Sequence, residues 1–160
     1  MIDRRWVFGV LMVAALAACS GEEPTEELLE RARSSLADGR PNAAVVDVKT
    51  ALQRDADNPE ARLLFGRAYM LQNDPASAVD EFRRAASSGN VEAEALYARA
   101  LVAAGQSSDL VEFHEQSEPA PAAANAPVYL ASLARAYSER GNAESADAAL
   151  RQARKIPISW

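Results

Sequence analysis

Residues 63–85, LLFGRAYMLQNDPASAVDEFRRA, carry the clearest structural pattern in the chain. Apolar residues recur every three to four positions on both sides of Asn73, which is the spacing of two amphipathic helices joined by a short turn. Asparagine suits the left-handed conformation that ends a helix. Small residues alternate with large ones along both patterns: Gly66, Ala78 and Ala85 against Phe65, Tyr69 and Phe82. The stretch therefore predicts a helical hairpin whose two helices approach closely.

The same hairpin pattern recurs along the rest of the chain. The turn residues Gly39, Asn73, Gly105 and Gly141 lie 34, 32 and 36 positions apart. Each turn residue follows a stretch with helical periodicity, about the length of one helix, and precedes a second such stretch. We expect repeats over residues 25–58, 59–90, 91–116 and 127–156. The Pro- and Ala-rich stretch 117–127 is expected to be a loop that bends or loosens the stack.

Residues of the same size class occupy the same phase in successive repeats. The small positions are Ala32, Gly66, Ala98 and Ala134 in the first helices, and Ala44, Ala78, Ala146, Ala51, Ala85 and Ala153 in the second helices. The large positions are Phe65, Tyr97 and Leu133, then Tyr69, Leu101 and Tyr137, then Val48, Phe82 and Leu150. This alternation resembles the tetratricopeptide repeat. The resemblance implies an all-α, right-handed superhelical solenoid of about four hairpins over residues 25–160, with the first helices on the concave side.

Two residues depart from the repeat pattern. Arg31 stands where the other repeats carry Phe65, Tyr97 and Leu133, so the first repeat is expected to be irregular. Leu110 replaces the alanine expected in the third repeat.

The N-terminal segment has the pattern of an export signal. Arg4 and Arg5 precede an uncharged apolar run, WVFGVLMVAALAA, over residues 6–18, which is shorter than the roughly 20 residues of a membrane span. Residues 16–19, LAAC, resemble a bacterial lipobox, which implies a signal peptide over 1–18 and a lipidated tether over 19–24 attached through Cys19, the single cysteine. Two or three acyl chains would hold the protein at a membrane permanently. The resemblance to bacterial lipoproteins also implies that Ser20, the residue after the cysteine, favours the outer membrane, facing the periplasm.

Composition and motifs exclude several function classes. Residues 19–160 carry a net charge of −7, which argues against nucleic acid as a partner. No Gly-rich phosphate loop, Ser/His/Asp order or CxxC motif is present, so we expect no enzyme, no cofactor and no metal. His114 is the only histidine, and its phase matches Val48 and Phe82. It is therefore expected to be a semi-buried core residue.

Four arginines share one phase of the first helices: Arg33, Arg67, Arg99 and Arg135. Each directly follows the small residue of its helix, a position that faces the groove in tetratricopeptide proteins. A guanidinium offers planar, bidentate donors that suit carboxylates. Two interpretations remain open. The arginines form a ladder for acidic groups of a peptide or polysaccharide, or they pair internally with carboxylates of neighbouring repeats.

Residues 43–90 and the third-repeat stretch ALYARALVAAGQSSDLVEF, residues 95–113, resemble the opening repeats of the tetratricopeptide lipoprotein of the PEP-CTERM/exosortase system. The resemblance implies a membrane-anchored adaptor that binds envelope proteins in exopolysaccharide export or the sorting of PEP-CTERM proteins. The alternative is a pilotin-like lipoprotein, or one that assists outer-membrane protein assembly.

The C-terminal repeat predicts a further contact. No polar helix follows the fourth hairpin, which ends in IPISW, residues 156–160. A terminal repeat needs a polar outer face, so we expect the protein to self-associate through its C-terminal repeat, or to be a truncated form of a longer array.

Overall fold

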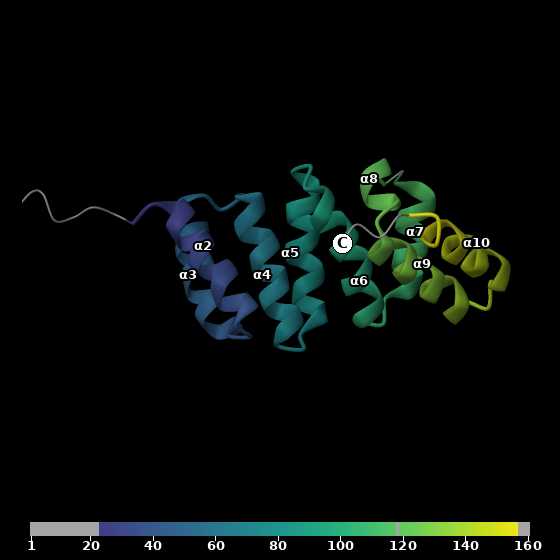
Figure 1. Ribbon diagram of the computed structural model, residues 1–160, viewed down its shortest axis with the longest axis horizontal. Coiled ribbons are helices and arrows are strands. Elements are labelled where there is room, and N and C mark those ends of the chain that lie inside the picture. Colours follow the sequence, from purple (N-terminus) through teal and green to yellow (C-terminus); the bar gives the residue numbers. More distant parts are fainter. Residues whose placement is uncertain (1–22, 118, 157–160) are drawn as a thin grey trace, which may run out of the picture.

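The computed structural model describes residues 23–117 and 119–156. Cys19 and the tail at 157–160 lie outside this part of the chain. In it, the helices stand side by side across the long axis, from α2 at one end to α10 at the other (Figure 1). They are α2 (Thr25–Ala37), α3 (Pro41–Arg54), α4 (Pro59–Leu71), α5 (Pro75–Ser87), α6 (Val91–Ala103), α7 (Ser107–Gln116), α8 (Pro121–Ala124), α9 (Pro127–Glu139) and α10 (Ala143–Ala153). The predicted all-α solenoid of hairpins is confirmed.

Local sequence sets where these helices begin and end. The four turn residues named from the sequence all have positive φ, between 59° for Asn73 and 76° for Gly105 and Gly141. That left-handed conformation ends each first helix and lets the chain reverse. Asparagine or aspartate side chains accept a hydrogen bond from the first turn of the next helix at Asn58, Asp74, Asn90 and Asn142. These caps satisfy backbone N–H groups that a helix start leaves unpaired.

In the second repeat a small residue on one helix is matched by a large residue on the other. Gly66 lies so near Phe82 that a Cβ at Gly66 would be 2.6 Å from the Phe82 ring carbon Cε1. Phe82 is 1% exposed, and it fills the space that the glycine leaves. In the first repeat the matching positions are Ala32 and Val48, and both residues are 0% exposed. A larger residue on one helix therefore demands a smaller one on the other.

The first helix α4 buries two faces, each in a different apolar cluster, and so links the first repeat to the later ones. On α4, Leu64 and Phe65 pack into the apolar cluster of α2 and α3, whereas Leu63 packs into the cluster that extends toward α9 and α10. The first repeat has no described helix before it to contact. Its residues in the phase of Ala61, Leu64, Phe65 and Ala68 are polar and exposed: Glu27, Glu30, Arg31 and Ser34.

Arg31, the irregular residue of the first repeat, forms ion pairs on this polar face. Its Nε donates to Asp47 Oδ2 on α3 at 3.1 Å, and its guanidinium also pairs with Glu23. Asp47 is only 9% exposed, so its carboxylate needs this partner. A charged pair thus closes this end of the described helices, where a phenylalanine would face water.

The third repeat is the loosest of the four. Leu110 takes the place of the small residue and is fully buried, and α6 and α7 pack over a much smaller interface than the helices of the other hairpins. The first helix of the next repeat, α9, contacts both of them instead. The stretch 117–127 is expected from its sequence to be a loop, but it contains the short helix α8. The residue before this helix, Ala120, donates its backbone N–H to the Glu94 carboxylate at 2.9 Å.

The last hairpin differs from the sequence-based expectation at one core position. Leu150 shares the phase of Val48 and Phe82, yet it is 42% exposed. Among the described residues, no helix follows α10 to cover it, whereas a further repeat packs beyond the other two positions. Self-association through this end stays a prediction.

The Gly66–Phe82 match gives a test of the packing. Gly66→Ala should destabilise the protein by about 1–3 kcal/mol through overpacking, and Phe82→Val should destabilise it by leaving a cavity, though by less than the about 3–5 kcal/mol typical of Phe→Ala. The double variant recreates the Ala32–Val48 pair of the first repeat. Its loss should be smaller than the sum by about 0.5–3 kcal/mol, measured by urea unfolding. Strictly additive losses would show that the two residues do not share one space.

Candidate functional site

A groove runs along the first helices of successive repeats. It consists of two adjoining hollows of about 440 Å³ and 320 Å³, and we call their combined surface the first-helix groove. The larger hollow is lined by Arg33, Leu36, Ala37, Arg67, Met70, Leu71 and Arg99, and the smaller one by Arg99, Val102, Ala103, Val128, Ala131, Ser132 and Arg135. All of these residues come from α2, α4, α6 and α9. The four arginines named from the sequence therefore line one continuous surface.

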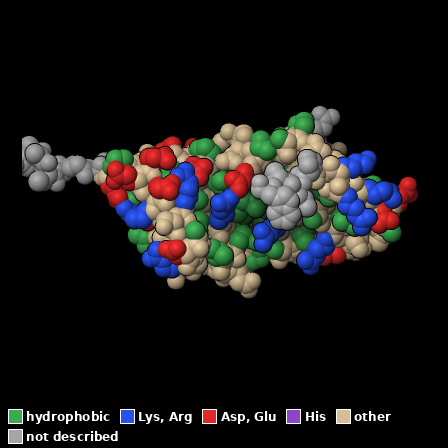
Figure 2. All heavy atoms as spheres, viewed as in Figure 1, with side chains coloured by type: hydrophobic (Ala, Val, Ile, Leu, Met, Phe, Trp, Pro, Cys, Tyr) green, Lys and Arg blue, Asp and Glu red, His purple; other side chains and the backbone are tan. Residues whose placement is uncertain are grey.

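The surface charge is uneven along the molecule. On the face turned toward the viewer in Figure 2, basic side chains are spread along the length of the solenoid, whereas acidic ones gather over the helices at the N-terminal end. The ion pairs of the four groove arginines differ accordingly between the two ends.

At the N-terminal end of the groove, internal carboxylates occupy the arginines. Arg33 pairs with Glu30 at 2.7 Å, with Glu60 at 3.2 Å and with Glu26 at 3.5 Å. These hydrogen bonds, led by the one to Glu30, raise the pKa of Arg33 above its ordinary value. Arg67 pairs with Glu92 on the first turn of the next first helix.

At the other end, Arg135 pairs with Glu139 of its own helix at 2.8 Å. Both side chains of this pair are largely exposed. An exposed i,i+4 pair contributes only about 0.3–0.5 kcal/mol, so a ligand carboxylate can compete for Arg135 more easily than for Arg33.

Arg99 is the exception in the ladder. Its side chain is exposed, and it has no ion-pair partner among residues 23–117 and 119–156. The reason lies in the next repeat. Glu60 and Glu92 occupy the second helical position of α4 and α6 and pair with the arginine of the preceding repeat, but the same position of α9 is Val128. Arg99 also stands at the junction of the two hollows, so it lies at the centre of the groove.

The groove floor is apolar. Leu71 is 55% exposed, Met70 and Val128 are half-buried, and Val102 is 7% exposed. These residues are not among those predicted from the sequence. A simple spacing rule finds most of them, since residues three or four positions after a groove arginine lie on the same side of the helix. For Arg33, Arg67 and Arg99 that spacing selects the apolar lining residues Leu36, Ala37, Met70, Leu71, Val102 and Ala103, whereas for Arg135 it selects Ser138 and Glu139, which line neither hollow. The groove can therefore hold a carboxylate and an aliphatic side chain next to each other.

The other residues singled out from the sequence lie elsewhere. His114 is half-buried in the packing of the third and fourth repeats, as its phase predicts, and its Nδ1 lies 3.0 Å from the Tyr129 hydroxyl. Within the described part of the chain, no group of His, Cys, Asp or Glu side chains has the arrangement of a metal site. The helices described here include none that is long and apolar enough to span a bilayer.

Comparison with known proteins finds one matching family model and several solved structures with a similar fold. Residues 35–87 match the family model of the tetratricopeptide repeat. A crystal structure of MamA superposes with a TM-score of 0.70 at 19% identity, covering 89% of this chain and 82% of that one. A second MamA crystal structure gives 0.67 at 18% identity, with 85% and 78% covered.

A third solved structure is built from repeats of the same kind. The crystal structure of a variant of a putative kinesin light chain from Podosopora anserina, with nearly identical TPR-like repeats, gives a TM-score of 0.64 at 22% identity, with 89% of this chain and 80% of that chain covered. No curated protein matches the sequence. The family model thus covers one part of the chain, and the solved structures, all under 25% identical to it, show that the rest has the same helical-repeat fold.

Proposed function

We propose that the first-helix groove binds a protein segment that carries carboxylates beside aliphatic side chains, and that Arg99 is its central contact. The observation that carries this proposal is the replacement of the expected glutamate by Val128, which leaves Arg99 without a partner among the described residues and adds apolar surface beside it. An acidic side chain of a partner can take the place that Glu60 and Glu92 take in the preceding repeats.

Charge alone would bind such a segment weakly. An exposed ion pair contributes about 0.2–1 kcal/mol, whereas an aliphatic side chain buried on the floor adds about 25 cal/mol for each Å² of apolar surface. The floor residues Leu71 and Met70 therefore supply most of the affinity, and Arg99 supplies the preference for acidic sequences.

The cellular role follows from the N-terminal segment. The LAAC motif supports lipidation at Cys19, and five residues, Ser20 to Pro24, then separate the anchor from α2. At about 3.3–3.6 Å per residue this tether spans less than about 20 Å, so the scaffold works close to the membrane surface. We place it at the outer membrane, facing the periplasm, as an adaptor in envelope assembly. The resemblance to the PEP-CTERM/exosortase lipoprotein favours exopolysaccharide export or the sorting of surface proteins.

The groove proposal is tested by selecting a random 12-residue peptide library on the purified protein. Selected peptides should be enriched in Asp or Glu next to Leu, Ile, Val or Phe. Arg99→Gln should weaken the best peptide about twofold to tenfold, because it removes one charged hydrogen-bond donor. Arg33→Gln should change binding little, because Arg33 already has internal carboxylate partners.

A second pair of variants leaves Arg99 untouched. Val128→Glu recreates the relation of Arg67 to Glu92 and should weaken peptide binding by pairing Arg99 internally. Val128→Gln has the same size without the charge and should retain most of the binding. Selected peptides without acidic residues, or equal effects of the two Val128 variants, would contradict the proposed role of Arg99.

The anchoring proposal is tested by cell fractionation. The wild-type protein should be found with outer membranes and carry the mass of an acylated Cys19. Cys19→Ser should move it to the soluble fraction with an unchanged helical circular dichroism spectrum, because Cys19 lies outside the repeats. Wild-type protein that is soluble and unmodified by mass spectrometry would refute the lipid anchor.

A further inference from the structure

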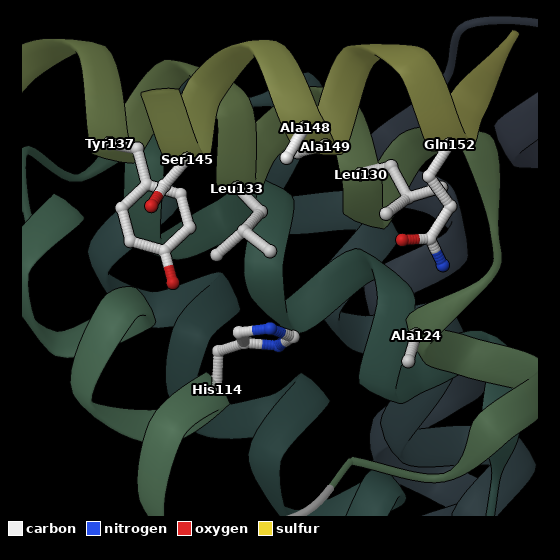
Figure 3. A pocket seen from close by; sticks show the side chains of 9 residues that line it. All are labelled: His114, Ala124, Leu130, Leu133, Tyr137, Ser145, Ala148, Ala149 and Gln152. Carbon is white, nitrogen blue, oxygen red and sulfur yellow. The ribbon is translucent and has the colours of Figure 1, made fainter. Parts of the chain in front are cut away.

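A further hollow lies between the third and fourth repeats and is separate from the two hollows of the first-helix groove. Its volume is about 220 Å³, and side chains of α7, α8, α9 and α10 line it. Figure 3 shows the His114 imidazole on one side, Leu133 with Ala148 and Ala149 on the opposite side, and Tyr137 and Gln152 at the two flanks. None of the nine lining side chains is an Asp, Glu, Lys or Arg. The hollow's own lining therefore offers no ionic partner to a charged ligand.

The shape of this hollow follows from the repeat pattern. His114 has the phase of Phe82, whose ring fills the crossing of the second repeat. The third repeat carries Ala98 rather than glycine at the matching first-helix position. The imidazole is instead directed into the space below α10 (Figure 3), where Ala148 and Ala149 are too small to fill it. The hollow therefore lies beside His114, between the third and fourth repeats.

A buried hydroxyl group fixes the hydrogen-bonding state of His114. Tyr129 is 0% exposed, and within the described residues its hydroxyl has one hydrogen-bond partner, the Nδ1 of His114 at 3.0 Å. Burial raises the pKa of Tyr129, so the hydroxyl keeps its proton. A buried hydroxyl must donate that proton, so Nδ1 accepts it. Burial also lowers the pKa of His114 and keeps the ring neutral, and its single proton is then on Nε2.

The opposite flank of the hollow supplies an acceptor. The Gln152 side-chain N–H₂ group donates to Asn125 Oδ1 at 2.7 Å. This leaves the Gln152 carbonyl oxygen as the free part of the amide, beside an apolar wall formed by Leu130 and Leu133. A ligand meets one N–H donor at His114, one carbonyl acceptor at Gln152 and hydrocarbon between them. Binding sites for small neutral molecules have this composition.

We propose that this hollow binds a neutral, phenol-like ring, supplied either as a free small molecule or as a tyrosine side chain of a bound protein. The ring lies against Leu133 and the alanines of α10, and its hydroxyl oxygen accepts from His114 Nε2–H. The imidazole and Tyr137 offer ring edges for aromatic packing. This site is independent of the groove, because the two share no residue.

The test uses His114 itself as the reporter. It is the only histidine in the chain, so the imidazole C–H signals of the purified protein report on this site in a proton NMR spectrum. Titration with p-cresol should shift these signals in a saturable way. Toluene, which lacks the hydroxyl, should bind about threefold to tenfold more weakly, and 4-methylbenzoate, which has the same ring with a charge, should cause no saturable shift.

Two substitutions and a tyrosine derivative complete the experiment. Ala148→Phe fills the hollow from an exposed position of α10 and should abolish the p-cresol shift, whereas Ala76→Phe, exposed on α5, should leave it unchanged. N-acetyl-tyrosinamide separates the sources: a shift like that of p-cresol supports a partner's tyrosine, and binding of p-cresol alone supports a free small molecule. Absence of a saturable p-cresol shift at millimolar concentration, equal binding of 4-methylbenzoate, or an unchanged shift in Ala148→Phe would each overturn the proposal.

Discussion

Space is limited where the two helices of the first and second hairpins cross, and the packing of these repeats depends on that limit. Gly66 and Phe82 show its tightest form, because even a methyl group on Gly66 would overlap the ring. The small and large residues recur at a period near 34. Between these repeats, α4 buries one face in the cluster of α2 and α3 and another in the cluster that begins with α5. The groove exists because the remaining face of every first helix points the same way. Its arginines directly follow the small residues that set the crossing.

Residues that depart from the repeat pattern give the surface its polar and hydrogen-bonding features. Arg31 and Asp47 replace apolar packing at the N-terminal end of the described helices. Val128 replaces a glutamate, and the arginine of the preceding repeat, Arg99, has no ion-pair partner among the described residues. His114 replaces a large apolar residue, and an uncharged hollow with a fixed hydrogen-bond donor results. In each case one residue in a repeated position changes what that position contacts.

Much of the fold could be predicted from the sequence, since periodicity and turn residues act locally. All four left-handed turn residues, and the buried state of Ala32, Ala44, Ala78 and Phe82, follow from phase alone. Phase could not show whether an arginine is paired, because pairing depends on the next repeat: Arg67 and Arg99 have the same local sequence position, and only Glu92 against Val128 separates them. Nor did phase show that Leu150 remains 42% exposed, or that α8 forms within the Pro- and Ala-rich stretch. Both depend on which neighbour covers a segment.

The proposed function rests on Arg99, and not Arg33, being the arginine that a partner's carboxylate meets. Arginine side-chain Nε–Hε resonances report this directly in a ¹H–¹⁵N NMR titration with an acidic peptide taken from the selection. We expect a large, saturable shift of the Arg99 resonance, a smaller one for Arg135, and little change for Arg33, which keeps its contacts to Glu30 and Glu60. A peptide that binds while the Arg99 resonance stays in place, or that shifts Arg33 most, would contradict this assignment.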